Sequence, residues 1–313
     1  MTTVAKAHPN IALIKYWGKQ LTAGNVPATP SLSITLDTLT STTRLNTAAQ
    51  DSFTLNGNLV DDQKIAACLA ILRERYDIPP LAVVSENNFP TAAGLASSAS
   101  GFAALVTAIN HHCSLDMSQA QQSAFAREAS GSAARSIFGG FVGLNQPDWV
   151  AKPLLDAELW PLRVVIAITD EHPKSVSSSL GMQRSQESSP FYPTWVADSE
   201  ADYAHAETAV EQKDFATLAQ LAEASCLKMH AVMQSSQPPL IYWNPATLAC
   251  LERIQKMQET GVEVFFTIDA GPQVKAVCTA EFEAEVTRAL ADVAGVLRTL
   301  TVGLGTGATI EDT

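Results

Sequence analysis

Hydrophobic and polar residues alternate with two different periods in the N-terminal part of the chain. SLSITLDTL, residues 31–39, places leucine or isoleucine at every second position, which is typical of a strand. FTLNGNLV, residues 53–60, adds the Asn-Gly pair of a tight hairpin. DDQKIAACLAILRERY, residues 61–76, changes to helical spacing, and LAVVSE, residues 81–86, predicts a buried strand.

Longer helical patterns dominate the C-terminal part. Asn244 as a cap, with Pro245 at the first helical position, predicts the start of a helix. The strand patterns VEVFFTI and QVKAVCT flank the turn DAGP, residues 269–272. The polar, serine-rich segment 170–190 predicts an interdomain connection or a substrate loop. Further predicted elements are a helix capped by Ser118 and Gln121, a strand at 162–169, helices near 195–211, 214–233 and 281–294, a last strand at 296–303, and a flexible tail beginning with GLGTGA at 303–308.

The composition limits the compartment and the partners of the protein. The chain of 313 residues is 46% hydrophobic, which suits a sizeable core and about two domains. No segment approaches the length of about 20 apolar residues that spans a membrane, and the N-terminus lacks the apolar core of a signal peptide, so we expect a cytoplasmic protein. Five scattered cysteines without a CxxC pair predict buried free thiols.

The charge of the chain bears on its ligands. A net charge of −12 without a basic run argues against nucleic acid as a partner, because phosphate neutralisation needs a basic face. A small anionic substrate needs only a few well-placed cations. Lys15, Lys19, Arg135 and Lys174 stand beside unusual local sequence and are candidates for them.

A stretch of small residues, FPTAAGLASSASGFAAL at 89–105, follows a predicted strand and leads into an apolar helical run. A glycine-bearing loop that enters a helix presents unpaired backbone N–H groups at the positive end of the helix dipole, which forms an anion site. Gly94 allows close approach of a ligand, and the Ser97 and Ser98 hydroxyls suit phosphate oxygens or magnesium. The structural alternative is a turn whose small residues let the helix pack tightly. A Walker-type motif is absent from the sequence.

Pro90 and the following Gly-Leu-Ala-Ser-Ser resemble the phosphate-binding motif of the GHMP kinase superfamily, named for galactokinase, homoserine kinase, mevalonate kinase and phosphomevalonate kinase. KSVSS at 174–178 and CLKMHA at 226–231 narrow the resemblance. Together with the stretch at 89–105, three further segments closely resemble the diphosphomevalonate decarboxylase family: NIALIKYWGK at 10–19, ASGSAARSIFGGFV at 129–142 and FTIDAGPQVK at 266–275. They follow the family order, so the resemblance covers essentially the whole chain.

The resemblance implies a fold and a reaction. The implied fold is α+β with two domains, an N-terminal domain like ribosomal protein S5 and a ferredoxin-like C-terminal domain, with the active site in the cleft between them. We place the boundary near residue 185, in the polar segment, which gives domains 1–185 and 186–313. The implied reaction converts mevalonate 5-diphosphate and ATP, with Mg²⁺, to isopentenyl diphosphate, ADP, phosphate and CO₂. A homodimer is implied by the resemblance alone.

Three residues match the catalytic positions of the family. Asp269 matches the aspartate proposed to orient or deprotonate the 3-hydroxyl group, and Lys15 matches a lysine near that aspartate. Arg135 matches the arginine that holds the substrate carboxylate, where a planar fork makes two parallel hydrogen bonds. Each residue also has an ordinary structural alternative. Asp269 suits a turn, Lys15 suits a strand edge, and Arg135 suits a helix-surface ion pair.

The remaining site residues divide between the two substrates. For the substrate diphosphate the resemblance implies Tyr16, Lys19, Ser130 and Ser132, with Ser178 from the polar segment. For ATP it implies Gly94, Leu95, Ala96, Ser97 and Ser98, with Ser97 and Ser98 also serving Mg²⁺. Ser85 and Asn87, just before the motif, are the candidates for the adenine side.

Three other functions remain open from the sequence. A kinase of the superfamily would phosphorylate without decarboxylation, but such relatives are expected to lack the lysine and aspartate that occur here as Lys15 and Asp269. A related enzyme would act on mevalonate 5-phosphate, and spacing alone does not separate it from an enzyme for the diphosphate. A binding or regulatory protein would retain the fold without catalysis. The complete set of charged site residues argues against this third alternative.

Overall fold

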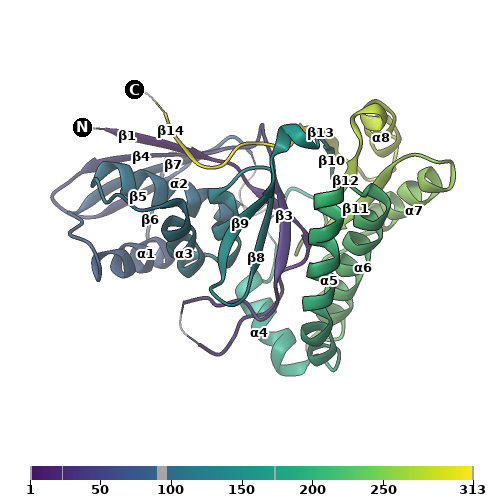
Figure 1. The fold of residues 1–313 in the computed structure, drawn as a ribbon, viewed down its shortest axis with the longest axis horizontal. Helices are drawn as coiled ribbons and strands as arrows, with labels where there is room; N and C mark the ends of the chain where they lie inside the picture. Colours follow the sequence, from purple (N-terminus) through teal and green to yellow (C-terminus); the bar gives the residue numbers. More distant parts are fainter. Residues whose placement is uncertain (1, 23, 90–96, 173, 312–313) are drawn as a thin grey trace.

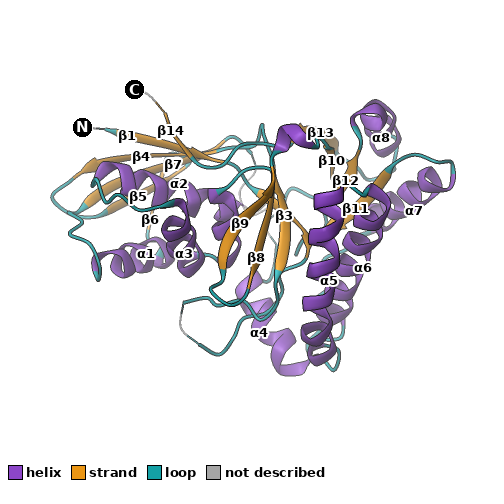
Figure 2. Ribbon diagram, viewed as in Figure 1, coloured by secondary structure: helices purple, strands orange, loops and turns teal. Residues whose placement is uncertain are grey.

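The computed structural model describes residues 2–22, 24–89, 97–172 and 174–311, which form three sheets with helices packed against them (Figure 1). Figure 2 shows helices and strands mixed throughout the molecule. The predicted two-domain fold of mixed α and β structure is confirmed. Within the described ranges, no helix is long and apolar enough to cross a membrane.

A six-stranded sheet of order β14-β1-β4-β7-β5-β6 forms one end of the molecule. Its strands are β1 (Thr3–Ala7), β4 (Ser41–Thr47), β5 (Ser52–Leu55), β6 (Asn58–Val60), β7 (Leu81–Asn87) and β14 (Thr309–Glu311). The predicted hairpin joins β5 to β6, and Asn56 and Gly57 both have positive φ, as this tight turn requires. The helices α1 (Gln63–Arg73), α2 (Ser97–His112) and α3 (Gln119–Ala129) accompany this sheet, and apolar residues of all three enter one core cluster with it.

A four-stranded sheet of order β2-β3-β8-β9 occupies the middle. It contains β2 (Asn10–Ile14), β3 (Ser31–Thr35), β8 (Phe141–Asn145) and β9 (Val150–Leu155), and the short helix η1 (Gly131–Ile137) precedes β8. Every residue of β2 and β3 is buried, including the serines of the alternating pattern in β3. The polar positions of that pattern therefore need partners inside the protein.

The third sheet, of order β11-β12-β10-β13, is antiparallel and is covered by the C-terminal helices. Its strands are β10 (Arg163–Ile168), β11 (Val264–Ile268), β12 (Val274–Cys278) and β13 (Arg298–Gly303). The helices α6 (Phe215–Gln234), α7 (Pro245–Glu259) and α8 (Glu283–Ala291) pack on this sheet, whereas α5 (Tyr192–Gln212) packs on α6 and on the middle sheet. The predicted caps are present, because Ser118 and Asn244 each form a capping box. Four of the five cysteines are buried, Cys113 is half-buried, and all are free.

Two segments predicted to be connections or tails are more ordered than their sequences suggest. The segment 170–190 contains a helix, α4 (Ser178–Ser188), which is capped by Ser177 and buries Met182 against an aromatic cluster that includes Trp17. The supposed tail adds β14 to the sheet of the N-terminal half, and Gly305 packs so closely on the Leu36 carbonyl that a Cβ atom would not fit. The predicted domain boundary at residue 185 falls inside α4. β10, which precedes this boundary in the chain, pairs with β12, which follows it.

Candidate active site

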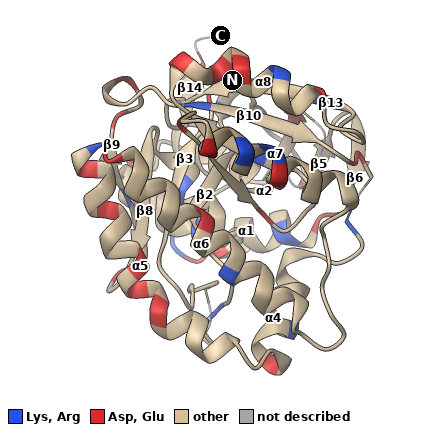
Figure 3. Ribbon diagram, turned by 90° about the vertical axis from the view of Figure 1, so that its right-hand side faces the viewer, with Lys and Arg blue, Asp and Glu red and all other residues tan. Residues whose placement is uncertain are grey.

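A cavity of about 580 Å³ is lined by residues from both halves of the chain. It brings together all the side chains predicted for catalysis and for binding of the mevalonate substrate: Lys15, Tyr16, Lys19, Ser130, Ser132, Arg135, Ser178 and Asp269. Ser97 and Ser98, predicted for ATP and Mg²⁺, also line it. The described lining carries five cationic side chains against the carboxylates of Glu128 and Asp269, in a protein of net charge −12. Figure 3 shows that many acidic residues lie instead on outer helices such as α5. The cavity therefore suits an anionic ligand.

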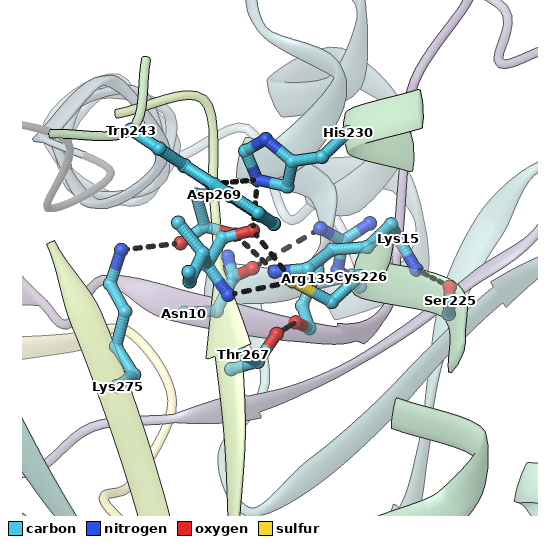
Figure 4. A network of polar contacts seen from close by, with 12 residues as sticks. Asn10, Lys15, Arg135, Ser225, Cys226, His230, Trp243, Thr267, Asp269 and Lys275 are labelled. Carbon is cyan, nitrogen blue, oxygen red and sulfur yellow. Dashed lines mark hydrogen bonds and ion pairs between the residues drawn. The ribbon is translucent and has the colours of Figure 1, made fainter. Parts of the chain in front are cut away.

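Asp269 and Lys15 meet at the centre of the site (Figure 4). Asp269 follows β11 and starts the turn into β12, where Gly271 donates its backbone N–H to the Asp269 carbonyl at 2.7 Å. Lys15 directly follows β2, and its Nζ donates to Oδ1 of Asp269 at 2.7 Å. The Lys15 side chain is 1% exposed, whereas that of Asp269 is 26% exposed. Lys15 is thus a buried partner of the carboxylate and not a strand-edge lysine.

A second lysine contacts the same carboxylate. Lys275, in β12, lies 3.1 Å from Oδ2 of Asp269 through its Nζ, and its side chain is 1% exposed. Burial alone raises the pKa of Asp269, but the ammonium groups of Lys15 and Lys275 outweigh it and hold the pKa well below its usual range. Burial also lowers the pKa of Lys275. The sequence analysis missed Lys275, although a single lysine inside the apolar strand VKAVC was a usable signal.

Arg135 is buried and is held by neutral oxygens. Its Nε donates to Ser33 Oγ at 3.0 Å, Nη1 to Ser31 Oγ at 2.5 Å and Nη2 to Asn10 Oδ1 at 3.2 Å. Burial lowers the pKa of Arg135 to about 10, so the guanidinium stays charged at neutral pH. Ser31 and Ser33 are the polar positions of the β3 pattern, which explains their burial. Within the described part of the chain, Arg135 has no carboxylate partner at ion-pair distance, and the predicted alternative of a surface ion pair is wrong.

Tyr16 lies beside η1 and is one of the residues that line the cavity. The Tyr16 hydroxyl is buried and has no hydrogen-bond partner among the described residues. Burial raises the pKa of Tyr16 well above its usual range, which keeps the hydroxyl neutral and able to donate. A Cβ atom on Gly131 would lie 2.7 Å from Tyr16 Cζ, so the glycine leaves the space that the tyrosine ring occupies. An unpartnered buried donor at this position suits a ligand oxygen.

Hydroxyl groups and two lysines line the rest of the cavity. The Oγ atoms of Ser98 and Ser130 are 3.4 Å apart, and those of Ser130 and Ser132 are 3.5 Å apart. Lys19 Nζ donates to Asn25 Oδ1 at 2.7 Å, and burial lowers its pKa. Lys174, the fourth cation noted in the sequence, donates to Ser178 Oγ at 2.8 Å, and burial lowers its pKa as well.

The predicted nucleotide side is described only in part. Ser97 and Ser98 begin α2 and line the cavity, whereas Gly94, Leu95 and Ala96 lie outside the described residues. Ser85 Oγ is 2.7 Å from Thr43 Oγ1, and Asn87 Oδ1 accepts from Ser41 Oγ at 2.5 Å, both within the sheet. Neither Ser85 nor Asn87 is among the described residues that line the cavity. The lining on this side includes residues of α1 that the sequence analysis did not select: Gln63, Lys64, Ala67, Cys68 and Ile71.

The three sheets, the helix that begins at Ser97 and the cationic cavity define a two-domain protein with the GHMP kinase fold. Family models match the chain as a diphosphomevalonate decarboxylase-like N-terminal domain over residues 7–149 and a mevalonate 5-diphosphate decarboxylase C-terminal domain over residues 164–302. The chain belongs to the diphosphomevalonate decarboxylase family.

Individual relatives agree with this assignment. The chain is 37% identical to the diphosphomevalonate decarboxylase of Candida albicans over 290 residues, which cover 84% of this chain and 80% of the relative. Mevalonate diphosphate decarboxylase from Staphylococcus aureus superposes with a TM-score of 0.92 at 35% identity, covering 99% of this chain and 98% of that one. A structure described as MDDEF in complex with MVAPP, AMPPCP and magnesium gives a TM-score of 0.91 at 36% identity, covering 100% of this chain and 99% of that one.

Proposed function

We infer that this chain catalyses the ATP-dependent decarboxylation of mevalonate 5-diphosphate to isopentenyl diphosphate, with ADP, phosphate and CO₂ as the other products. The observation that carries the inference is the pair of Asp269 and Lys15, 2.7 Å apart, in a cavity whose described lining has more cations than carboxylates. Relatives of the same fold bind a mevalonate diphosphate and an ATP analogue with magnesium, which are anions that such a lining attracts.

The chemistry explains why ATP is needed. The substrate carboxylate has no neighbouring carbonyl group to accept electrons when CO₂ leaves, so the electrons must displace the group on the tertiary carbon. Hydroxide is a poor leaving group. Transfer of the ATP γ-phosphoryl group to the 3-hydroxyl converts it to a phosphate, and loss of that phosphate together with CO₂ forms the double bond.

Asp269 is the residue that contacts the 3-hydroxyl in this proposal. Its carboxylate is ionised, because Lys15 and Lys275 hold its pKa down, and it accepts a hydrogen bond and then the proton from the hydroxyl during phosphoryl transfer. Lys15, beside it, stabilises the negative charge that develops on the transferred phosphoryl group. Because its low pKa makes Asp269 a weak base, it mainly orients the hydroxyl and takes the proton only as the new O–P bond forms.

Arg135 is proposed to hold the substrate carboxylate. A guanidinium has five N–H groups, and three are directed at Ser31, Ser33 and Asn10. One N–H remains on each terminal nitrogen, which is the arrangement that binds a carboxylate with two parallel hydrogen bonds. Release of CO₂ then starts from a fixed carboxylate.

The phosphates are proposed to bind on both sides of this centre. The substrate diphosphate contacts Tyr16, Lys19 and the hydroxyls of Ser130, Ser132 and Ser178, all of which line the cavity. The ATP phosphates bind at the start of α2, at Ser97 and Ser98 and at the preceding Gly94, Leu95 and Ala96. The described residues contain no cluster of three metal-ligating side chains, so Mg²⁺ would be held mainly by phosphate oxygens together with Ser97 or Ser98, and would neutralise phosphate charge.

Carboxylate-labelled mevalonate 5-diphosphate, mixed with the protein, Mg²⁺ and ATP, tests this function. We expect equal amounts of CO₂ and ADP, and a lower rate with the 5-monophosphate. Asp269→Asn should lower turnover by about 10²-fold or more and retain ATP binding, because the charge at the 3-hydroxyl is lost while the nucleotide side is intact. ADP without CO₂ would identify a kinase, preference for the monophosphate would reassign the substrate, and absence of both products would refute the proposal.

We also propose the finer features that the resemblance implies: a homodimer, a cytoplasmic location and a domain boundary near residue 185. Light scattering after size-exclusion chromatography tests the first of these. A separately expressed fragment 1–185 tests the last: cooperative unfolding of the isolated fragment would support the boundary, and a fragment without cooperative unfolding would overturn it.

A further inference from the structure

The Asp269 carboxylate is held at both oxygens by lysines that approach from different elements. Oδ1 accepts from Lys15, which follows β2, and Oδ2 lies at 3.1 Å from the ammonium of Lys275 in β12 (Figure 4). We propose that Lys275 is a second positioning lysine of the reaction, which fixes the orientation of the Asp269 carboxylate from the protein interior. This inference rests on the proposed role of Asp269 at the 3-hydroxyl.

The place of Lys275 in the sheet sets it apart from the described lining of the cavity. It pairs with Ile166 of β10 on one side and Thr267 of β11 on the other, so it lies within the sheet and not at its edge. Its side chain is 1% exposed and is not among the described residues that line the cavity, whereas Lys15 is. Lys275 therefore acts through Asp269, while Lys15 borders both the carboxylate and the cavity.

Lys275 is a buried charged residue in the otherwise apolar strand β12, where an apolar side chain would be the usual choice. Removing an ammonium from water is costly unless a partner compensates for it, and Asp269 provides that partner. The side chain of Val277, two residues along β12, belongs to a core cluster with Ile166 and Phe265, which shows how apolar this face of the sheet is. A lysine in such surroundings serves the carboxylate that it contacts and not the packing of the strand.

The charge balance around Asp269 makes the second lysine effective. The titratable and charged groups that face Asp269 come from five elements or their ends: Lys15 after β2, Arg135 in η1, Lys174 before α4, Cys226 and His230 in α6, and Lys275 in β12. Cys226 and His230 are neutral at pH 7, because burial raises the pKa of the thiol to about 11 and lowers that of the imidazole to about 3. The ionised state of Asp269 therefore depends on its cationic neighbours, of which Lys15 and Lys275 are in contact.

Fixing both oxygens also fixes the direction of the remaining lone pairs. A carboxylate that is bound at one oxygen only can turn about its Cβ–Cγ bond, which moves its free lone pairs away from a substrate hydroxyl. A misplacement of about 1 Å at a reacting group can lower a rate by about 10²-fold. Loss of Lys275 should therefore lower kcat and leave the affinity for substrate nearly unchanged.

Lys275→Met, which keeps an unbranched side chain one atom shorter and removes its charge, tests the proposal. Selective ¹³C labelling of aspartate carboxyl carbons reports the pKa of Asp269 directly, with the signal assigned by its absence in Asp269→Asn. We expect the pKa of Asp269 to rise by about 1 to 3 units and kcat to fall about 10- to 100-fold, with KM within about 3-fold. Thr267→Val is the matched control, because Thr267 is the buried neighbour of Lys275 in β11 and donates to the Ala12 carbonyl at 3.2 Å. It should leave the pKa of Asp269 unchanged.

A double-variant cycle tests whether Lys275 acts through Asp269, while kcat and the Asp269 pKa separate a positioning role from a purely structural one. Asp269→Asn leaves two buried ammonium groups without their anion, so adding Lys275→Met should raise the melting temperature in that background and lower it in the wild type. The proposal would be overturned if neither Lys275→Met nor the double variant folds, or if Lys275→Met changes the melting temperature equally in the wild-type and Asp269→Asn backgrounds. In either case Lys275 would serve the fold independently of Asp269. An unchanged Asp269 pKa in folded Lys275→Met would overturn it as well. If the wild-type protein releases no CO₂, the proposed function fails instead.

Discussion

Replacement of Arg135 by lysine keeps a positive charge in the site and removes the planar fork. The guanidinium contacts Ser31, Ser33 and Asn10 through three different nitrogens, at 2.5, 3.0 and 3.2 Å. A lysine presents three N–H groups on a single nitrogen, so it cannot reach these three oxygens and a substrate carboxylate together. Arg135→Lys therefore tests whether the geometry of the cation matters in addition to its charge.

The structure sets the size of the expected effect. In the proposed binding mode at least one of the two hydrogen bonds to the substrate carboxylate is lost, and a hydrogen bond to a charged group contributes about 1.5 to 3 kcal/mol. This corresponds to a loss of about 10- to 150-fold in kcat/KM for mevalonate 5-diphosphate. Inside the protein, loss of one or two of the contacts that now hold Arg135 should lower the free energy of unfolding by about 2 to 4 kcal/mol.

Steady-state kinetics with mevalonate 5-diphosphate and ATP, each varied separately, measure the first effect, and urea unfolding measures the second. Affinity for ATP should stay within about 3-fold of the wild type, since the start of α2 is unchanged. The matched control is Arg73→Lys, because Arg73 also uses its fork, on Asp51 at 2.6 and 2.9 Å, but does not line the cavity. If Arg135→Lys retains wild-type kcat/KM, or if Arg73→Lys loses as much, Arg135 does not hold the substrate carboxylate.

Two further predictions concern Tyr16 and His230. Gly131→Ala should raise KM for mevalonate 5-diphosphate about 10-fold or more, because the new Cβ would lie 2.7 Å from Tyr16 Cζ and displace the ring. The control is Gly101→Ala in α2, where a Cβ meets nothing within 4 Å. Equal KM values in the two variants would contradict the reasoning. Burial lowers the pKa of His230 to about 3, whereas the unfolded chain has a pKa of about 6.5. The stability that depends on the neutral imidazole is therefore complete above pH 6.5 and is lost progressively as the pH falls from 6.5 towards 3. His230→Gln should flatten the fall in unfolding free energy between pH 6.5 and pH 4 in urea titrations, and an unchanged slope would remove His230 as its cause.

Much of the fold was predictable, because local signals decide where its elements begin. Ser118 and Asn244 carry capping boxes, and the Asn56-Gly57 turn fits one backbone shape, so periodicity and turn chemistry located these elements. α4 was missed because its serine-rich sequence is typical of a loop. Its stability comes from the Ser177 cap and from packing of Met182 on distant aromatic residues, which no local pattern reveals.

The candidate site was predictable where a motif carried it. The resemblance located Asp269, Lys15 and Arg135 on separate segments, and the fold brings all three to one cavity. Lys275 was missed, because in sequence it is one lysine in an apolar strand and its partner is set by the register between strands. The partners of Arg135 were missed for a similar reason, since Ser31 and Ser33 formed the polar half of an ordinary strand pattern.

Arg135 is buried among neutral oxygens, whereas Lys15 and Lys275 are buried against a carboxylate, and this difference suits them to different roles. Arg135 is surrounded by neutral oxygens, so its charge is not compensated within the described part of the site and remains available to an anionic ligand. Lys15 and Lys275 share one carboxylate, so much of their charge is already compensated, and they hold that carboxylate in place. Under the proposed function, the neutral-oxygen cradle around Arg135 is therefore the place for the substrate carboxylate, and the Asp269 carboxylate between two ammonium groups is the place where the 3-hydroxyl is oriented.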